Sequence, residues 1–311
     1  MTQVMDKKIL IIIPYFGSLP GWMELFLLSC GANQGFHWLI PTDDTRPFHA
    51  PANVTLRRES FSGFKGKVAE ALSFATGDLA WGPYKLCDLK PFYGFIFADD
   101  LAGYDYWGFG DLDLLYGRLD NFITAEMLER YKVISFHDDR ISGHLCLVRN
   151  SGSMVASCLE IPHWREQVAC QKHIGIDEGD YSGVHFFVRK HFGWRKWLKH
   201  KQNYRKLRLH RIFDRDIYAE ELFTTPLTDI PWRDGALYGE QPLRWVWDNG
   251  RVYSEPDGQE SPYIHFMNFK SSRWLKPGPA PWEGLSSIVH AEGPLEAVSR
   301  IEVKPEGIFA A

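Results

Sequence analysis

The sequence predicts an α/β fold in which a mostly parallel central sheet is flanked by helices. Strand-like and helix-like segments alternate through the first hundred residues, beginning with a β-branched run over Ile9–Pro14. Such alternation places helices over the faces of a parallel sheet. With 311 residues, 45% of them hydrophobic, the chain is long enough to bury a large core.

The first elements follow one another in a regular order. After the strand at Ile9–Pro14 comes a turn-rich segment, 16–21, and then an apolar stretch over 22–30 that predicts a helix. Second and third strands are expected at 37–40 and 54–57. Ligands bind beyond the carboxyl ends of parallel strands, and in this chain those ends carry Tyr15, Phe16, Asp43 and Asp44.

The remaining elements are predicted from the same patterns. A helix is expected over 85–97, although Pro91 lies inside it. Three further strands are expected at 106–109, 133–136 and 144–148, and two further helices at 150–165 and 180–189. Residues 271–311 are rich in Gly and Pro and predict an irregular or helical C-terminal extension, packed as a tail on a single domain of residues 1–270.

Composition narrows the class of protein. The net charge of −4 argues against general nucleic-acid binding, so no nucleic-acid partner is expected. The five cysteines show no paired metal-binding spacing, and their odd number and apolar neighbours indicate reduced core residues of a cytoplasmic protein. The apolar run after Lys7-Lys8 is too short to span a bilayer, and no secretory signal is expected.

Two carboxylates stand two residues apart in the run Tyr104-Asp-Tyr-Trp-Gly-Phe-Gly-Asp-Leu-Asp113. On a strand, Asp111 and Asp113 would project on the same side. Both could then bind one hard cation, and Mg²⁺ or Mn²⁺ held by oxygen ligands commonly bridges to a diphosphate. Without a counter-charge, two carboxylates in such apolar surroundings would be costly. The pattern therefore favours a metal-dependent enzyme that handles a sugar nucleotide.

A histidine near the C-terminus could complete this site. His265 lies in the run Tyr-Ile-His-Phe-Met-Asn-Phe-Lys270, and neutral imidazole is a good ligand for Mn²⁺. Lys270 could neutralise a diphosphate as a point charge. The alternative is a histidine whose hydrogen bonds are satisfied in a core strand, with no ligand to hold.

Two further charged segments have open interpretations. Lys85 and Asp88 are neighbours on one helix face. They form either a surface ion pair that adds little stability or contacts to the sugar of a nucleotide sugar. The acidic segment after Gly175 carries Asp177 and Glu178. This segment is either a helix N-terminus with acidic capping or a functional segment. In the second case it would supply a catalytic carboxylate or a carboxylate that binds sugar hydroxyls.

The segment 189–211 is basic and aromatic, and it contains no Asp or Glu. This mixture suits a surface that lies on anionic lipid headgroups with its aromatic rings at the interface. Nucleic acid could use the same chemistry through phosphate contacts and stacking. A solvated helix whose charges serve solubility is the remaining alternative.

Taken together, these motifs resemble those of nucleotide-sugar glycosyltransferases of the Rossmann-like GT-A fold. The order matches over about residues 7–270: a strand ending in a nucleotide loop, a helix with Lys and Asp, a Gly-Asp-x-Asp strand end, an acidic segment and a late His-x-x-Asn-x-Lys. The resemblance is strongest to bacterial polysaccharide-type enzymes that pair Asp-x-Asp with a C-terminal histidine.

The resemblance implies a role for each motif. Asp111 and Asp113 match the motif for metal and diphosphate, with His265 as the third protein ligand. Lys270 matches the phosphate-binding lysine. The remaining matched positions would lie around the nucleotide and its sugar, with Tyr15 and Phe16 at the nucleobase, Asp43 or Asp44 near the base or ribose, and Lys85 and Asp88 near the donor sugar.

The function implied is transfer of a hexose, most commonly from a UDP-sugar, to a growing surface polysaccharide or glycolipid, with Mn²⁺ or Mg²⁺ as cofactor. Asp177-Glu178 stands where retaining relatives commonly carry Asp-Gln, so the stereochemistry stays open. An inverting enzyme would use Asp177 or Glu178 as base. A phosphohydrolase or nucleotidyltransferase, and a non-catalytic glycan-binding module, are the alternatives.

Overall fold

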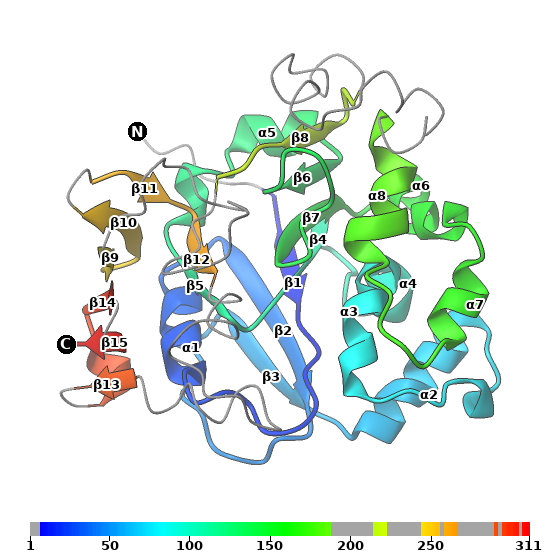
Figure 1. The fold of residues 1–311 in the computed structure, drawn as a ribbon, viewed down its shortest axis with the longest axis horizontal. Coiled ribbons are helices and arrows are strands. Elements are labelled where there is room, and N and C mark those ends of the chain that lie inside the picture. Colours follow the sequence, from blue (N-terminus) through cyan, green and yellow to red (C-terminus); the bar gives the residue numbers. More distant parts are fainter. Residues whose placement is uncertain are drawn as a thin grey trace.

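The central feature of the fold is a seven-stranded sheet with helices on both faces (Figure 1). The computed structural model describes residues 7–187, 214–222, 244–255, 258–265, 289–291, 294–304 and 307–311. The order of the strands in the central sheet is β3-β2-β1-β4-β7-β6-β8. Their bounds are β1 Ile9–Ile12, β2 Phe36–Thr42, β3 Val54–Arg58, β4 Tyr106–Gly110, β6 Val133–Ser135, β7 Leu145–Arg149 and β8 Ile217–Ala219.

The sheet is mostly parallel, as predicted. β1 pairs in parallel with β2 and β4, β2 with β3, and β6 with β8. Only β7 runs against its neighbours β4 and β6 within this sheet. Six of these strands lie at the predicted places, whereas β8 was not predicted from the sequence.

The first strand explains why the sheet needs cover on both faces. Successive strand side chains point to opposite faces, and Ile9 and Ile11 join the core that contains helix α1, Met23–Gly31. Leu10 and Ile12 join the opposite core. That second core is covered by α2 (Phe61–Leu72), α3 (Leu86–Leu89), α4 (Tyr93–Ile96), α6 (Gly152–Ala156), α7 (Trp164–Ala169) and α8 (Ser182–His185). A run that is buried on both faces is continuously apolar rather than alternating.

Two predicted helices are broken where proline occurs. The segment 85–97 forms α3, a 3₁₀ turn at Lys90–Phe92 and then α4, because Pro91 lacks the N–H that a continuous helix requires. The segment 150–165 likewise divides into α6, a 3₁₀ turn and α7, with Pro162 between the last two. A short helix, α5 (Ala125–Arg130), lies between β5 (Leu114–Tyr116) and β6.

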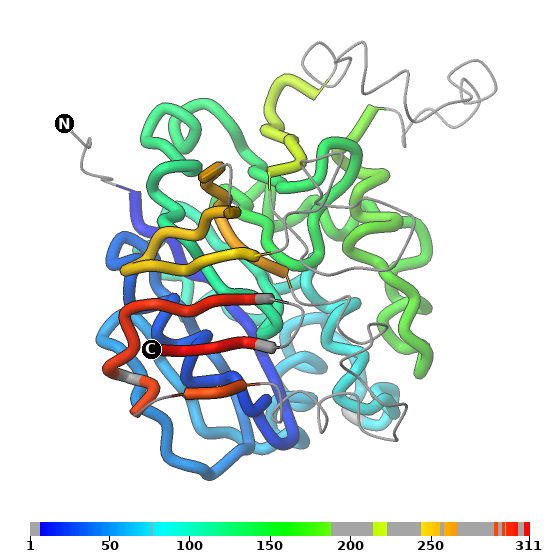
Figure 2. The backbone as a smooth tube through the Cα atoms, turned by 60° about the vertical axis from the view of Figure 1, so that its left-hand side comes forward, coloured from blue at the N-terminus to red at the C-terminus, as the bar shows by residue number. Residues whose placement is uncertain are grey.

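A second sheet of six strands covers the side of the body that carries α1. Its order is β11-β10-β9-β14-β15-β13, and Figure 2 shows these strands side by side, coloured yellow to red. Trp245, Trp247 and Ile301 pack into the same core as α1. The bounds are β9 Arg244–Asp248, β10 Arg251–Glu255, β11 Glu260–Ser261, β13 Val289–Ala291, β14 Arg300–Lys304 and β15 Gly307–Ala310.

This sheet corrects the expectation of an irregular or helical C-terminal extension for the part that the structure describes. β13, β14 and β15 all lie beyond residue 270, and β14 pairs antiparallel with β9 from before it. The apolar residues of β14 alternate in the strand period, with Ile301 and Val303 buried. The Gly- and Pro-rich composition of 271–311 obscured that alternation.

A third, two-stranded pairing joins distant parts of the chain. β5 (Leu114–Tyr116) pairs antiparallel with β12 (Tyr263–His265), and His265 lies opposite Leu114. The indole N–H of Trp22 donates to the carbonyl of Leu112 at 2.8 Å, and that of Trp247 to the carbonyl of Tyr116, also at 2.8 Å. These contacts fix the segment that follows β4.

Some of the features predicted from the sequence lie in described residues, and others do not. The whole basic segment 189–211 and Lys270 lie outside the described residues. All five cysteines are described, and each is a free thiol, as expected. In the ranges given above, no helix combines the length and apolar character needed to cross a bilayer.

Candidate active site

A cavity of about 440 Å³ opens at the carboxyl ends of β1 and β4. This is where parallel α/β sheets usually bind ligands. Tyr15 and Phe16 reach it from the end of β1, and Asp111 and Asp113 from the end of β4. It is also lined by His265, Lys90, Asp177 and Glu178.

Asp111, Asp113 and His265 form a cluster that could hold a metal ion. One ligand atom from each lies within 4.8 Å of the others, and Nε2 of His265 is 3.6 Å from Oδ1 of Asp113. Asp113 and His265 are buried, whereas Asp111 is partly exposed to the cavity. Two carboxylates and one imidazole are a donor set that suits Mn²⁺ or Mg²⁺.

The backbone brings this cluster together differently from the sequence prediction. β4 ends at Gly110 and β5 begins at Leu114, so the two aspartates lie in a bend and not on a strand. His265 arrives through the pairing of β12 with β5. Its ring also packs against that of His144, with centroids 4.5 Å apart, and His144 lies 2.8 Å from the hydroxyl of Tyr263. The imidazole is therefore both a core residue and directed at Asp113.

Lys90 is the site residue that the sequence did not indicate. Its buried ammonium donates to Oδ1 of Asp111 at 2.7 Å and to the carbonyl of Gly143 at 2.8 Å, and it lies 3.7 Å from Oδ2 of Asp177. Burial lowers the pKa of Lys90, but the charges of Asp111 and Asp177 outweigh it and hold the pKa well above its usual value. Lys90 is thus the counter-charge for both carboxylates.

A signal for Lys90 was present in the sequence but was ambiguous. Two lysines, Lys85 and Lys90, lie in the same predicted helix upstream of the acidic pair. Residues five apart on a helix face different sides, at roughly 140°, so only one of them could point to the carboxylates. Nothing in the sequence decides which, because the turn at Pro91 rotates the end of the segment.

The acidic segment enters the cavity through a π-helical turn, Asp177–Tyr181. Burial raises the pKa of Asp177 to about 7, Lys90 acts to lower it, and the neighbouring Glu178 raises it. Gly143 allows this close approach, because a Cβ there would lie 2.8 Å from Oδ2 of Asp177 and 3.0 Å from Oε1 of Glu178. An acid that titrates near neutrality is suited to accept or hold a proton.

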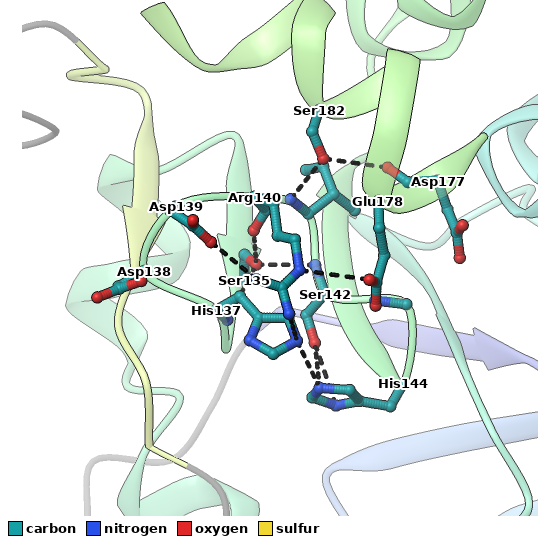
Figure 3. Close-up of polar contacts among 12 residues, drawn as sticks. Ser135, His137, Asp138, Asp139, Arg140, Ser142, His144, Asp177, Glu178 and Ser182 are labelled. Atoms are coloured by element: carbon teal, nitrogen blue, oxygen red, sulfur yellow. Dashed lines mark hydrogen bonds and ion pairs between the residues drawn. The ribbon is translucent and has the colours of Figure 1, made fainter. Parts of the chain in front are cut away.

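Glu178 is held from the loop between β6 and β7. Figure 3 shows the guanidinium of Arg140 directed at Glu178 on one side and at Asp139 and His137 on the other. The Arg140 Nε to Glu178 Oε2 distance is 3.3 Å, and the N–H of Gly143 also donates to this carboxylate at 3.3 Å. Its position is therefore fixed, although the side chain remains 41% exposed.

Tyr15 and Phe16 both line the cavity, and their expected place at the nucleobase stays a prediction. Tyr15 is half-buried, and burial followed by the charge of Asp113 raises the pKa of its phenol. Phe16 packs its ring against Phe61 and Phe64, each at a centroid distance of 5.2 Å. The two residues form an aromatic wall beside the acidic pair.

Asp43 and Asp44 do not line the cavity; they hold the loop between β1 and α1. Oδ1 of Asp43 accepts from the N–H of Gly17, and Oδ2 of Asp44 from that of Leu19, both at 2.7 Å. Arg46 also binds Asp44, and chiefly this contact holds the pKa of Asp44 far below its usual range. Both side chains therefore support the loop that carries Tyr15 and Phe16, and their expected place near the base or ribose stays a prediction.

Lys85 and Asp88 are likewise absent from the lining of the cavity, and they form a buried pair instead of a surface one. Their charged atoms are 2.8 Å apart, and Lys85 also donates to the carbonyls of Gln167 and Lys172. Asp88 accepts from three successive backbone N–H groups, at 2.7 to 3.0 Å, those of Ile174, Gly175 and Ile176. The pair therefore fixes the loop that leads into Asp177.

The burial of this pair predicts a large loss of stability when it is broken. Asp88→Asn leaves Lys85 without its buried counter-charge, which should lower the free energy of unfolding by about 3 kcal/mol. The matched control is Asp216→Asn, which breaks an exposed pair with Lys132 and should change stability by less than about 1 kcal/mol. Urea unfolding of both variants measures this; equal midpoints would contradict a structural role for Asp88.

The galactosyltransferase LgtC, solved with donor and acceptor sugar analogues, aligns with 89% of this chain and 92% of its own, at 9% identity and a TM-score of 0.41. An active-site mutant of LgtC gives 10% identity, a TM-score of 0.37 and coverage of 88% and 92%.

The glycosyltransferase GlyE of Streptococcus pneumoniae TIGR4 gives 10% identity and a TM-score of 0.33, covering 76% of this chain and 58% of its own. No curated protein sequence matches the chain significantly. One sequence family matches residues 11–277, from the first strand to beyond His265. The chain is therefore a member of the family of unknown function DUF6625.

Proposed function

We propose that this chain is a metal-dependent glycosyltransferase that moves a hexose from a nucleoside diphosphate sugar, preferably a UDP-sugar, to a glycan or lipid-linked glycan. The observation that carries the proposal is the Asp111, Asp113 and His265 cluster, which opens into one cavity with Asp177 and Glu178. A cation site can stabilise the departing diphosphate, and the carboxylates can act as a base or bind sugar hydroxyls. The order of motifs resembles that of GT-A enzymes.

In this proposal the cation cluster and the two aromatic residues beside it receive the nucleoside diphosphate of the donor. The Asp111, Asp113 and His265 cluster would hold Mn²⁺ or Mg²⁺, and a bound cation would stabilise the charge that develops on the departing diphosphate. Tyr15 and Phe16 would lie against the nucleobase. Lys270, which is outside the described residues, would share the charge of the phosphates.

The transfer exchanges one bond to the anomeric carbon for another. The oxygen of an acceptor hydroxyl bonds to C1 of the donor hexose, and the bond from C1 to the phosphate oxygen breaks. The nucleoside diphosphate leaves with that electron pair. The hydroxyl proton passes to Asp177 or Glu178 in an inverting enzyme, or to the leaving phosphate in a retaining one.

Lys90 serves both halves of this scheme. By binding Asp111 it keeps a cation ligand in place, and through its charge it lowers the pKa of Asp177. The ionised form of Asp177 is the one that can accept a proton, so Lys90 extends the pH range in which the carboxylate can act as a base. The same lysine would therefore affect both cation binding and proton transfer.

Substitution of a cation ligand tests the core of the proposal. Asp113→Ala removes one of three ligands and should abolish both sugar transfer and the Mn²⁺-dependent part of UDP binding, while urea unfolding stays cooperative. Titration calorimetry with UDP, with and without Mn²⁺, measures the second effect. Asp120→Ala, an exposed acidic position in the next turn, is the control. Full turnover of Asp113→Ala, or of the native protein in excess chelator, would refute the mechanism.

The pH dependence of turnover tests the role of Asp177. The rate of UDP release, as kcat/KM, should fall as Asp177 is protonated, with an acid limb at or below pH 7, because its pKa is about 7 and a bound cation would lower it. Lys90→Met removes a positive charge, so the pKa of Asp177 rises and the limb should move to higher pH. Lys132→Met, which is exposed and outside the cavity lining, should leave it in place. A limb that stays fixed in Lys90→Met would exclude this role.

We also propose that the basic segment 189–211 binds the anionic inner face of the cell membrane, where a lipid-linked acceptor would be found. The proposal rests on its ten basic residues interleaved with aromatic rings and on its lack of Asp and Glu. Binding to vesicles containing phosphatidylserine should weaken with salt and weaken further in the double variant Lys196→Glu, Lys199→Glu. Unchanged vesicle sedimentation of that variant would contradict the proposal.

A further inference from the structure

The mouth of the cavity carries an exposed aromatic ring with no role in the proposed donor site. Tyr84 lines the cavity, yet it is 70% exposed. Ile174, on the facing loop, is 47% exposed. These are two of the three large apolar side chains that stand out most from the described surface, the other being Leu159. An aromatic ring exposed at the edge of a cavity is a typical feature of a binding surface.

The ring of Tyr84 is held by a rigid support. It packs edge-on against the imidazole of His173, with centroids 5.0 Å apart and planes at 72°. Nδ1 of His173 is 3.1 Å from Oδ1 of the buried Asp88. Lys85, the next residue after Tyr84, donates to the carbonyl of Lys172 at 2.9 Å.

Both sides of this support therefore depend on the same buried ion pair, Lys85 and Asp88. The pair joins the turn that carries Tyr84 to the loop that carries His173. A surface that is ordered before a ligand arrives loses less conformational entropy on binding. The buried pair thus supports the ring of Tyr84, although neither Lys85 nor Asp88 lines the cavity.

The place of Tyr84 in the cavity favours contact with the acceptor over contact with the donor. His173 precedes Asp177 by four residues, a distance that an extended chain limits to roughly 14 Å, and the exposed part of Glu178 lies in the same cavity. Tyr15, in contrast, is close enough to Asp113 for that charge to raise its pKa after burial. The nucleobase would thus lie beside Tyr15, whereas Tyr84 packs on the loop that leads to Asp177 and Glu178.

We propose that Tyr84, supported by His173, is a stacking platform for a neutral pyranose ring of the acceptor, which presents a hydroxyl to Asp177 or Glu178. The C–H face of a pyranose would pack on the aromatic ring, and the two carboxylates would accept hydrogen bonds from its hydroxyls. Their negative charge disfavours an anionic sugar in this subsite. The inference rests on the proposed glycosyltransferase function, whose acceptor class it specifies.

Saturation-transfer NMR with three methyl pyranosides, those of β-galactose, β-glucose and α-mannose, tests the platform. In the native protein with UDP and Mn²⁺, at least one pyranoside should receive saturation mainly at the protons of one ring face. Tyr84→Ala should weaken that binding at least about five-fold, whereas Tyr84→Phe and Tyr84→Trp should retain it, because stacking requires a ring and not the hydroxyl. Leu159→Ala removes another exposed apolar side chain, one outside the cavity lining, and should have no effect.

Parallel titration of UDP with Mn²⁺ separates the possible failures. Unchanged UDP affinity in Tyr84→Ala is expected. A loss of UDP affinity would assign the ring to the nucleobase and overturn the acceptor platform, as would pyranoside binding that does not depend on Tyr84 or is absent from the native protein. If the native protein binds a pyranoside through Tyr84 but neither binds UDP nor turns over UDP-sugars, the proposed transferase function fails while the sugar-binding surface stands.

Discussion

The site depends on a single buried ammonium, that of Lys90. Asp111 and Asp177 come from different parts of the chain and share one cavity, where two unpaired carboxylates would repel each other and resist burial. Lys90 lies 2.7 Å from the first and 3.7 Å from the second. Because removing one partner leaves the others buried without compensation, the bend after β4 and the turn at 177–181 are energetically coupled through this lysine.

A second lysine, Lys85, also joins separate segments of the chain, but it does so outside the cavity lining. Lys85 pairs with Asp88, and together they bind the backbone on both sides of His173. The two lysines flank the short α3 helix: Lys85 forms a buried ion pair with Asp88, and Lys90 directs its ammonium at the cavity. The break at Pro91 is part of this arrangement, since it ends α3 where Lys90 must turn toward Asp111. Rigid support of this kind is what positions a reactive side chain accurately.

The sequence predicted what depends on local pattern and missed what depends on distant pairing. Strands such as β1 and β2 were predicted because a continuous apolar run of this length has few alternatives. Asp111, Asp113 and His265 were predicted by the chemistry of their side chains. The second sheet was missed because β14 gains its partner β9 from more than fifty residues away. Lys90 was missed because its contacts with Asp111 and Asp177, which distinguish it from Lys85, come from distant parts of the chain and are not a property of a sequence window.

The pairing of β5 with β12 makes cation binding a matter of tertiary structure. Two of the three candidate ligands follow β4, and the third is placed by a pairing of only three residues across some 150 positions of chain. A ligand that binds only the assembled cluster stabilises the assembly by mass action. Cation binding should therefore favour the docked position of β12 and, through Tyr263 and His144, the order of the β6–β7 loop that holds Glu178. The cation site and the neighbouring carboxylates Asp177 and Glu178 are in this way parts of one cooperative unit.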